Sequence, residues 1–186
     1  MKSNVIQYSR IINNVPWANY SDLDKIINIL GGSETTKLVG GVVRNALIKE
    51  RINDIDLATK IIPVEVKNKL TKHNLEVLDF AKDHGTICVK GDKGLYQITT
   101  LRKDIETDGR HANVTFTRDF FEDAKRRDFT INALYCDFNG CLFDPINAIE
   151  DLISLKVKFI GSPEKRIDED RLRILRYFRF VAYYSN

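Results

Sequence analysis

The sequence predicts an α+β protein, in which a small mixed sheet carries packed helices and is followed by a helical end. Short apolar runs bounded by turn residues predict the strands, and stretches with apolar residues at helical spacing predict the helices. From about residue 148 the strand pattern stops and a helical pattern follows. With 43% hydrophobic and 30% charged residues, the chain can bury a core and is globular rather than disordered.

Helices and strands alternate in the first part of the chain. The paired glycines Gly31-Gly32 are expected to end the first helix, and Pro63 suits the first turn of the third. The expected elements, in order, are a helix at 22–30, a strand at 37–40, a helix at 42–50, a strand at 54–59 and a helix at 63–75.

The middle of the chain predicts two hairpins. Residues 85–91 and 95–102 form strands around a short turn. Residues 124–138 are expected to start as a helix and end as a strand, and Asn139-Gly140 after them is typical of a type I′ turn that leads into a second short strand. The polar residues 103–123, between the hairpins, are expected to form a loop.

The last part of the chain is expected to be helical. Within residues 163–184, the apolar residues Leu172, Leu175, Phe178 and Val181 recur at helical spacing beside a dense row of arginines.

Composition limits the cellular setting. A net charge of +3 and a pI near 8.7 permit a polyanionic partner without requiring one. Three cysteines without a C-x-x-C pair suggest free thiols in a reducing compartment. The opening residues lack the apolar run of a signal peptide, and no window approaches the roughly 20 apolar residues of a membrane span. We therefore expect a cytoplasmic protein without a membrane partner.

A glycine pair between a strand and a helix offers an anion site. Gly40 and Gly41 would let backbone N–H groups approach phosphate oxygens at the start of a helix, and Arg44 lies one turn into that helix. The alternative is a plain strand–helix turn with a solvated arginine.

Asp54 and Asp56 raise the odds of a nucleotide site. In a strand, residues two apart point to the same face, and two like charges held that close repel each other unless a cation lies between them. Carboxylates suit Mg²⁺, which is usually held by one or two of them together with substrate phosphates, and two such ions can serve an in-line displacement. The alternative is that Asp54 caps a turn and Asp56 is simply exposed.

Two further patterns combine carboxylates with arginines. In RRDFTIN, residues 126–132, Asp128 and Asn132 are four apart and would share a helix face, where they suit sugar hydroxyls, while the two arginines suit phosphates. In EDRLRILRYFRF, residues 169–180, Asp170 and Arg173 would lie side by side and could read the edge of a base. A charged surface turn and a surface ion pair worth about 0.2–0.5 kcal/mol are the respective alternatives.

The order of these motifs resembles one family, the class II tRNA nucleotidyltransferases (CCA-adding enzymes) with the related bacterial poly(A) polymerases. LVGGVVRN is similar to the family's G-G-x-V-R-D, DIDLAT to its metal motif and RRDFTIN to its ribose motif. TTLRKDIETDGRH resembles the loop before the ribose motif, DP…EDL the hinge segment, and EDRLRILR the nucleotide-reading E-D-x-x-R. The resemblance runs from about residue 25 to residue 180.

The resemblance implies a fold related to DNA polymerase β and a template-independent transfer of CMP or AMP. The domains would be an N-terminal extension at 1–24, a nucleotidyltransferase head at 25–147 and the start of a helical neck at 148–186. The 3′-hydroxyl of a tRNA or another RNA would attack the α-phosphate of ATP or CTP, and pyrophosphate would leave.

The resemblance also implies a role for each motif residue. Catalysis and binding of two Mg²⁺ would fall to Asp54 and Asp56. Nucleotide binding would fall to Gly40, Gly41 and Arg44 at the triphosphate, to Arg127, Asp128 and Asn132 at the ribose motif, and to Asp170, Arg173 and Arg176 at the base.

Departures from the family pattern keep other functions open. Asn45 stands where the family usually has Asp, and Gln97 stands where it often has an acid that could take a proton. The chain ends inside the expected neck, which leaves apolar residues near the end without part of their cover and raises the possibility of a second polypeptide. The alternatives are a head that binds nucleotide or RNA without chemistry, half of a split enzyme, a poly(A) polymerase, and an unrelated α/β protein.

Overall fold

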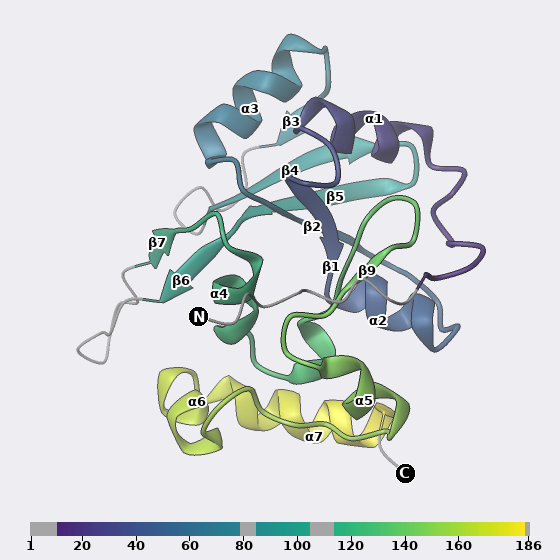
Figure 1. Ribbon diagram of the computed structural model, residues 1–186. Coiled ribbons are helices and arrows are strands. Elements are labelled where there is room, and N and C mark those ends of the chain that lie inside the picture. The colour runs from purple at the N-terminus through teal and green to yellow at the C-terminus, as the bar shows by residue number, and fades with distance from the viewer. Residues whose placement is uncertain (1–10, 79–84, 105–113, 185–186) are drawn as a thin grey trace, which may run out of the picture.

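A seven-stranded mixed sheet organises the first three quarters of the chain (Figure 1). The structure is a computed structural model and describes residues 11–78, 85–104 and 114–184. The seven strands of the sheet lie in the order β3-β4-β5-β2-β1-β8-β9. The central pair β2 and β5 is parallel, and the other neighbours are antiparallel. The predicted mixed sheet with packed helices is confirmed.

The elements of the first half lie close to their predicted places. They are α1 (Ser21–Ile29), β1 (Thr36–Val39), α2 (Gly41–Leu47), β2 (Ile55–Thr59), α3 (Pro63–Lys72), β3 (Val77–Leu78), β4 (Thr86–Gly91) and β5 (Gly94–Thr100). The glycines after α1 both take positive φ, at 90° and 73°, so they end the helix as expected.

The prediction of a loop at 103–123 is wrong in part. The segment contains most of a two-stranded sheet, β6 (Arg102–Asp104) with β7 (Val114–Phe116), and the start of α4 (Phe120–Lys125). Residues 105–113 lie outside the described part of the chain. Asp119 caps α4 by accepting a hydrogen bond from the Phe121 N–H at 2.8 Å, a signal that the polar composition of the segment concealed.

The second predicted hairpin is present, but its turn is of another type. β8 (Tyr135–Cys136) pairs with β9 (Leu142–Phe143). Asn139 does not take the positive φ that a type I′ turn requires, whereas Gly140 does, at 93°. The Gly140 N–H donates to the Asp137 carbonyl at 3.2 Å, which leaves Gly140 as the left-handed residue after the turn.

The two faces of the sheet carry separate cores. One is built with α1, α2 and α3 and includes Trp17, Leu57 and Tyr96, all fully buried. The other lies under α4 and includes Ala58, Phe120 and Tyr135. Because Asp56 and Ala58 share a face by strand alternation, the helix α4 covers the sheet beside Asp56 and leaves Asp56 itself at the margin.

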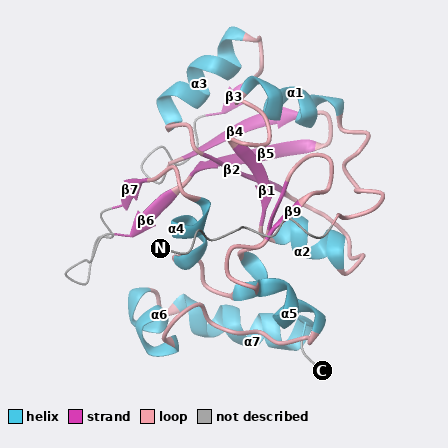
Figure 2. Cartoon of the chain, viewed as in Figure 1, coloured by secondary structure: helices cyan, strands magenta, loops and turns pink. Residues whose placement is uncertain are grey.

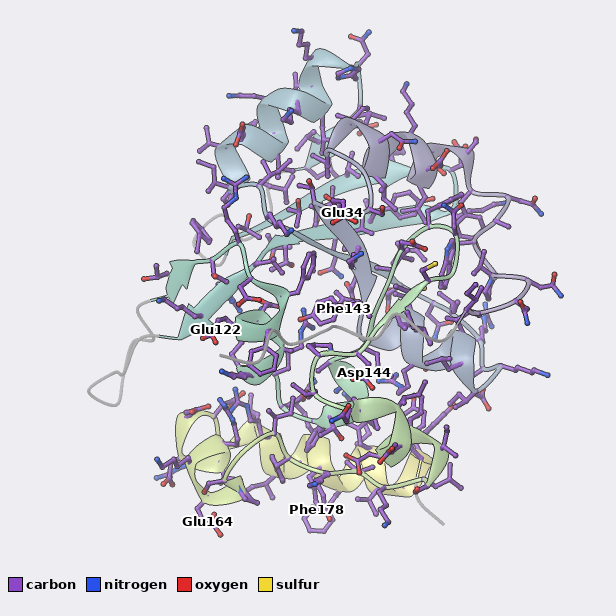
Figure 3. The ribbon with its side chains drawn as sticks, viewed as in Figure 1. Glu34, Glu122, Phe143, Asp144, Glu164 and Phe178 are labelled. Atoms are coloured by element: carbon purple, nitrogen blue, oxygen red, sulfur yellow. The ribbon has the colours of Figure 1, made fainter. Side chains whose placement is uncertain are left out.

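The helical end follows the sheet as predicted. α5 (Ala148–Ile153), α6 (Pro163–Glu169) and α7 (Leu172–Tyr184) lie together on one side of the molecule (Figure 2). Asp144, labelled between β9 and α5 in Figure 3, accepts hydrogen bonds from the N–H groups of Ala148 and Ile149 at 2.8 and 2.9 Å and so starts this end.

The apolar stripe predicted on the last helix faces solvent. Leu172, Leu175 and Phe178 are each about two-thirds exposed, and Figure 3 shows Phe178 projecting away from the sheet. Phe180 is the buried side chain of α7 and packs on Phe129. None of the helices in the described residues has both the length and the apolar character needed to cross a bilayer.

Candidate nucleotide-binding site

One pocket is lined by the D-x-D pair on one side and by the end of the last helix on the other. It has a volume of about 430 Å³ and lies between the start of β2, the start of α2 and the end of α7. Both acids of the pair, Asp54 and Asp56, line the pocket together with cationic and aromatic side chains. These include Arg44, Arg179, Tyr183 and Tyr184. A pocket of this size suits a small ligand.

The glycine turn is shaped as a backbone cradle. Gly40 has φ 73° and ψ −124°, a conformation that residues with a Cβ atom rarely adopt, and its own N–H donates to the Leu134 carbonyl at 3.1 Å. A Cβ on Gly40 would lie 3.9 Å from Nη1 of Arg127. The turn therefore holds the start of α2 close to an arginine, and Gly41 lines the pocket.

The two acids differ in environment. Asp54 is exposed just before β2, whereas Asp56 is half-buried within it. Burial raises the pKa of the Asp56 carboxyl, the charge of Arg127 lowers it, and the charge of Asp54 raises it again. A half-buried acid with a second acid two residues away favours a bound cation beside the pair.

Gln97 lies directly beside Asp56. The parallel register of β2 and β5 pairs the two residues, and the antiparallel register of β4 and β5 pairs Gln97 with Cys88. Gln97 is exposed. The position next to the acids therefore carries a neutral amide, which cannot accept the proton of an attacking hydroxyl.

Arg44 is held from several sides. It is buried, its guanidinium lies 4.4 Å from the ring centre of Tyr184, and its Nε donates to Oδ1 of Asn45 at 3.2 Å. Asn45 thus orients Arg44 as an amide where an acid was expected. Its Nδ2 donates to the Arg51 carbonyl at 2.8 Å, which ties this arrangement to the loop before β2.

The ribose-motif residues meet, although not on a helix. Phe129 between them is extended, with φ −118° and ψ 148°, and only residues 130–132 form a 3₁₀ turn, so the expected shared helix face is wrong. Asn132 nevertheless donates to Oδ1 of Asp128 at 3.0 Å and accepts a hydrogen bond from Arg44.

Asp128 also binds the last helix. Its Oδ2 accepts from Nε of Arg176 at 2.8 Å and lies 2.6 Å from Nη2. Although burial acts in the opposite direction, the hydrogen bond from Asn132 and the charge of Arg176 keep the pKa of Asp128 below its usual value. A continuous chain of bonds therefore runs from Arg44 through Asn132 and Asp128 to Arg176.

Arg127 is fixed by a group that the sequence did not single out. Asp123, on α4, accepts from Nε and Nη2 of Arg127 at 3.1 and 2.9 Å, from Nε of Arg126 at 2.8 Å and from the hydroxyl of Tyr135 at 2.8 Å. Burial would raise the pKa of Asp123, but the charges of Arg127 and Arg126 hold it at about 2. An acid three and four residues before two arginines, in a helical stretch, is the signal that could have found it.

The residues expected to read the base are arranged differently from the prediction. Arg173 donates to Oε2 of Glu169 at 2.5 Å and to the Arg166 carbonyl at 2.9 Å, not to Asp170. Asp170 interrupts the helices and accepts from the Leu172 N–H at 3.0 Å. Neither Asp170 nor Arg173 lines the pocket, whereas Arg179, further along α7, does so.

Comparison with known proteins places this geometry in context. A family model described as the poly A polymerase head domain matches residues 36–158. The CCA tRNA nucleotidyltransferase 1, mitochondrial, of Homo sapiens is 46% identical over 147 residues, which are 78% of this chain and 34% of that protein. This chain spans about a third of the length of the curated relatives it matches. Because that relative is mitochondrial, the cytoplasmic location stays a prediction.

Two solved structures share the fold. The crystal structure of the Bacillus stearothermophilus CCA-adding enzyme in complex with CTP matches with a TM-score of 0.76 and 33% identity, over 89% of this chain and 39% of that one. A tRNA nucleotidyltransferase complexed with a primer tRNA and an incoming ATP analog matches with a TM-score of 0.65 and 28% identity, over 86% and 44%.

Proposed function

The chain belongs to the poly A polymerase head-domain family, and from this premise we propose that it transfers CMP or AMP from CTP or ATP to the 3′ end of tRNA. The observation that carries the proposal is the pocket in which Asp54 and Asp56 face Arg44 and the end of α7. Acids for a metal ion, a guanidinium for phosphate and aromatic rings for a base are there within reach of one ligand.

The donor set fits Mg²⁺ bound together with a nucleotide. Within the described residues, no group of three or more His, Cys, Asp or Glu side chains is placed to hold a metal ion. Asp54 and Asp56 would supply two hard oxygen ligands, and triphosphate oxygens would complete the shell, as is usual for Mg²⁺. When bound, the ions would activate the attacking hydroxyl and stabilise the leaving oxygen.

The protein's own residues would position the reactants. The glycine turn and Arg44 would hold the triphosphate, and Arg127, which Asp123 fixes in place, would add positive charge beside Gly40. Positioning and charge stabilisation of this kind supply most of the rate in phosphoryl transfer.

Recognition of ribose and base by the remaining motif residues is also a proposal. Asp128 and Asn132 already bond to each other and to arginines. A ribose hydroxyl would therefore have to replace one partner in these hydrogen bonds. Arg176 and Arg173 lie on successive turns of α7, outside the lining of the pocket, and Glu169 pairs with Arg173. From there the two arginines would read the edge of a base.

A second candidate is a module that binds nucleotide or RNA without chemistry. Gln97 beside Asp56 favours it, because the site then lacks a third carboxylate to take the proton. The exposed apolar residues of α7 were the reason to expect a second polypeptide, and the comparisons offer no support for one.

A transfer assay separates these functions. The protein is incubated with Mg²⁺, labelled CTP or ATP, and a tRNA that lacks its 3′ end, with Asp54→Ala as the control. Incorporation by the wild type and not by Asp54→Ala supports the enzyme, and long adenylate tails would favour poly(A) synthesis. Nucleotide binding without incorporation, with wild type equal to Asp54→Ala, would support the binding module.

A further inference from the structure

A second pocket lies at the opposite end of β2 from the acids. It has a volume of about 460 Å³ and is bordered by the end of α1, the start of α3 and the residues after β7 (Figure 1). Its lining residues are Leu30, Gly31, Thr35, Lys60, Ile61, Ile62, Glu65, Lys69, Phe116, Thr117 and Arg118. No residue is shared with the first pocket.

The walls of this pocket are fixed by backbone hydrogen bonds. The Lys60 N–H donates to the Thr35 carbonyl at 3.0 Å, and the Leu101 N–H donates to the Thr59 carbonyl at 2.8 Å. The Thr117 N–H in turn donates to the Leu101 carbonyl at 2.9 Å. These bonds join β1, β2, β5 and the β7 segment, so the pocket is a preformed part of the fold.

The charge in this pocket is not balanced. Lys60, Lys69 and Arg118 face a single carboxylate, Glu65. Across the described ranges, none of the three cations forms an ion pair; the ammonium of Lys60 lies 5.4 Å from the ring centre of Phe120 instead. Such an excess of cations attracts an anionic group.

An aromatic ring stands at the edge of the cationic pocket. Phe116 is 41% exposed and packs closely on the backbone of Gly85, where an added Cβ would lie only 2.8 Å from the ring. Gly85 has φ 77°, so the turn under the ring favours glycine. An exposed ring held next to cations is the combination that binds single-stranded nucleic acid, because the base stacks while the phosphate is neutralised.

We propose that this pocket binds one nucleotide of a single-stranded RNA, with its phosphate on Lys69 and Arg118 and its base against Phe116. RNA as the ligand rests on the proposed function, whereas the cationic pocket with its ring stands independently of it. The site would hold the acceptor RNA at a distance from the reacting end.

The test is RNA binding and its salt dependence. Fluorescence anisotropy is measured with a labelled oligouridine of about 12 nucleotides, between about 50 and 200 mM salt. The double variant Lys69→Gln/Arg118→Gln should bind about 10-fold more weakly at low salt. Its slope of log affinity against log salt should be shallower by about 0.7, since one phosphate of the single strand is no longer neutralised. Phe116→Leu should weaken binding at every salt concentration without changing the slope.

Lys72→Gln is the matched control, since Lys72 is an exposed lysine of α3 outside both pockets. It should bind as the wild type does. The inference is overturned if the double variant equals Lys72→Gln in affinity and slope, or if the wild type does not bind the RNA at low salt.

Mg²⁺-dependent binding of CTP or ATP to the wild type and the double variant keeps the two proposals apart. Nucleotide binding that is intact in both proteins, together with unchanged RNA binding in the double variant, would overturn only the second pocket. Failure of the wild type itself to bind the nucleotide would count against the proposed function.

Discussion

Two groups of carboxylates in this protein stand in opposite situations. Asp123 is 1% exposed and surrounded by Arg126, Arg127 and a tyrosine hydroxyl. Asp54 and Asp56 border an open pocket, and burial together with the charge of Asp54 raises the pKa of Asp56. We call Asp123 with its partners the closed group, because its charge is balanced within the protein. Asp54 and Asp56 form the open group, which needs a cation from outside. The difference indicates that Asp123 serves structure and positioning, and that the D-x-D pair serves a ligand.

The largest expected effect is the loss of nucleotide incorporation when an acid of the open group is neutralised. Asp56→Asn should lower nucleotide incorporation by about 10³-fold or more, because one ligand of the proposed metal site becomes neutral. The free energy of unfolding should change by no more than about 0.5 kcal/mol, since no ion pair is lost. Single-turnover incorporation and urea denaturation measure the two quantities.

Asp24→Asn on α1 is the control for this substitution, since it removes an acid far from the pocket. It should keep full incorporation. A fall in stability of several kcal/mol in Asp56→Asn would contradict the contrast, since it would place Asp56 among the structural acids.

Neutralising the acid of the closed group should lower the stability of the protein. Asp123→Asn leaves Arg126 and Arg127 partly buried without their counter-charge, and we expect the free energy of unfolding to fall by about 3–5 kcal/mol. Glu122→Gln is the matched control one residue away, because its ion pair with Lys125 at 2.9 Å is substantially exposed and worth at most about 1 kcal/mol. Equal urea midpoints for the two variants would show that the buried pairs add nothing.

A change of pH should affect the stability of the protein in opposite directions through the two groups. The pKa of Asp123 is about 2 in the folded protein against 3.8 without the fold, so its contribution is present above pH 3.8 and is lost as the pH falls towards about 2. The loss should be on the order of 2 kcal/mol. The pKa of Asp56 is raised, so its contribution has the opposite sign and stability is lost as the pH rises through its titration.

Denaturation of the wild type, Asp123→Asn and Asp56→Asn across this acid range measures both effects. The wild type should lose stability below pH 3.8 and Asp123→Asn should lose less. Asp56→Asn should gain on the wild type as the pH rises through the range in which Asp56 titrates. Parallel curves for all three proteins would contradict the assignment.

Local patterns in the sequence predicted the open group better than the closed one. The apolar pattern predicted the strand that holds Asp56, although Asp54 lies one residue before it, and the glycine pair marked the turn before α2. Asp123 was missed because α4 has only six residues and lies in a polar segment that also holds three-residue strands. Strands and helices that short give no clear period.

The remaining errors concern side-chain partners that only the tertiary fold decides. Arg173 takes Glu169 instead of Asp170, because Asp170 is not helical and its carboxylate caps the next helix. Asp128 and Asn132 meet through a 3₁₀ turn rather than along a helix face. Their spacing predicted the contact, but the extended Phe129 between them could not be foreseen.

The most direct measurement is calorimetric binding of CTP or ATP with and without Mg²⁺, for the wild type and for Asp54→Asn/Asp56→Asn. The account predicts that Mg²⁺ tightens nucleotide binding in the wild type and has no such effect in the double variant. Equal Mg²⁺-dependent affinity in both proteins would contradict it.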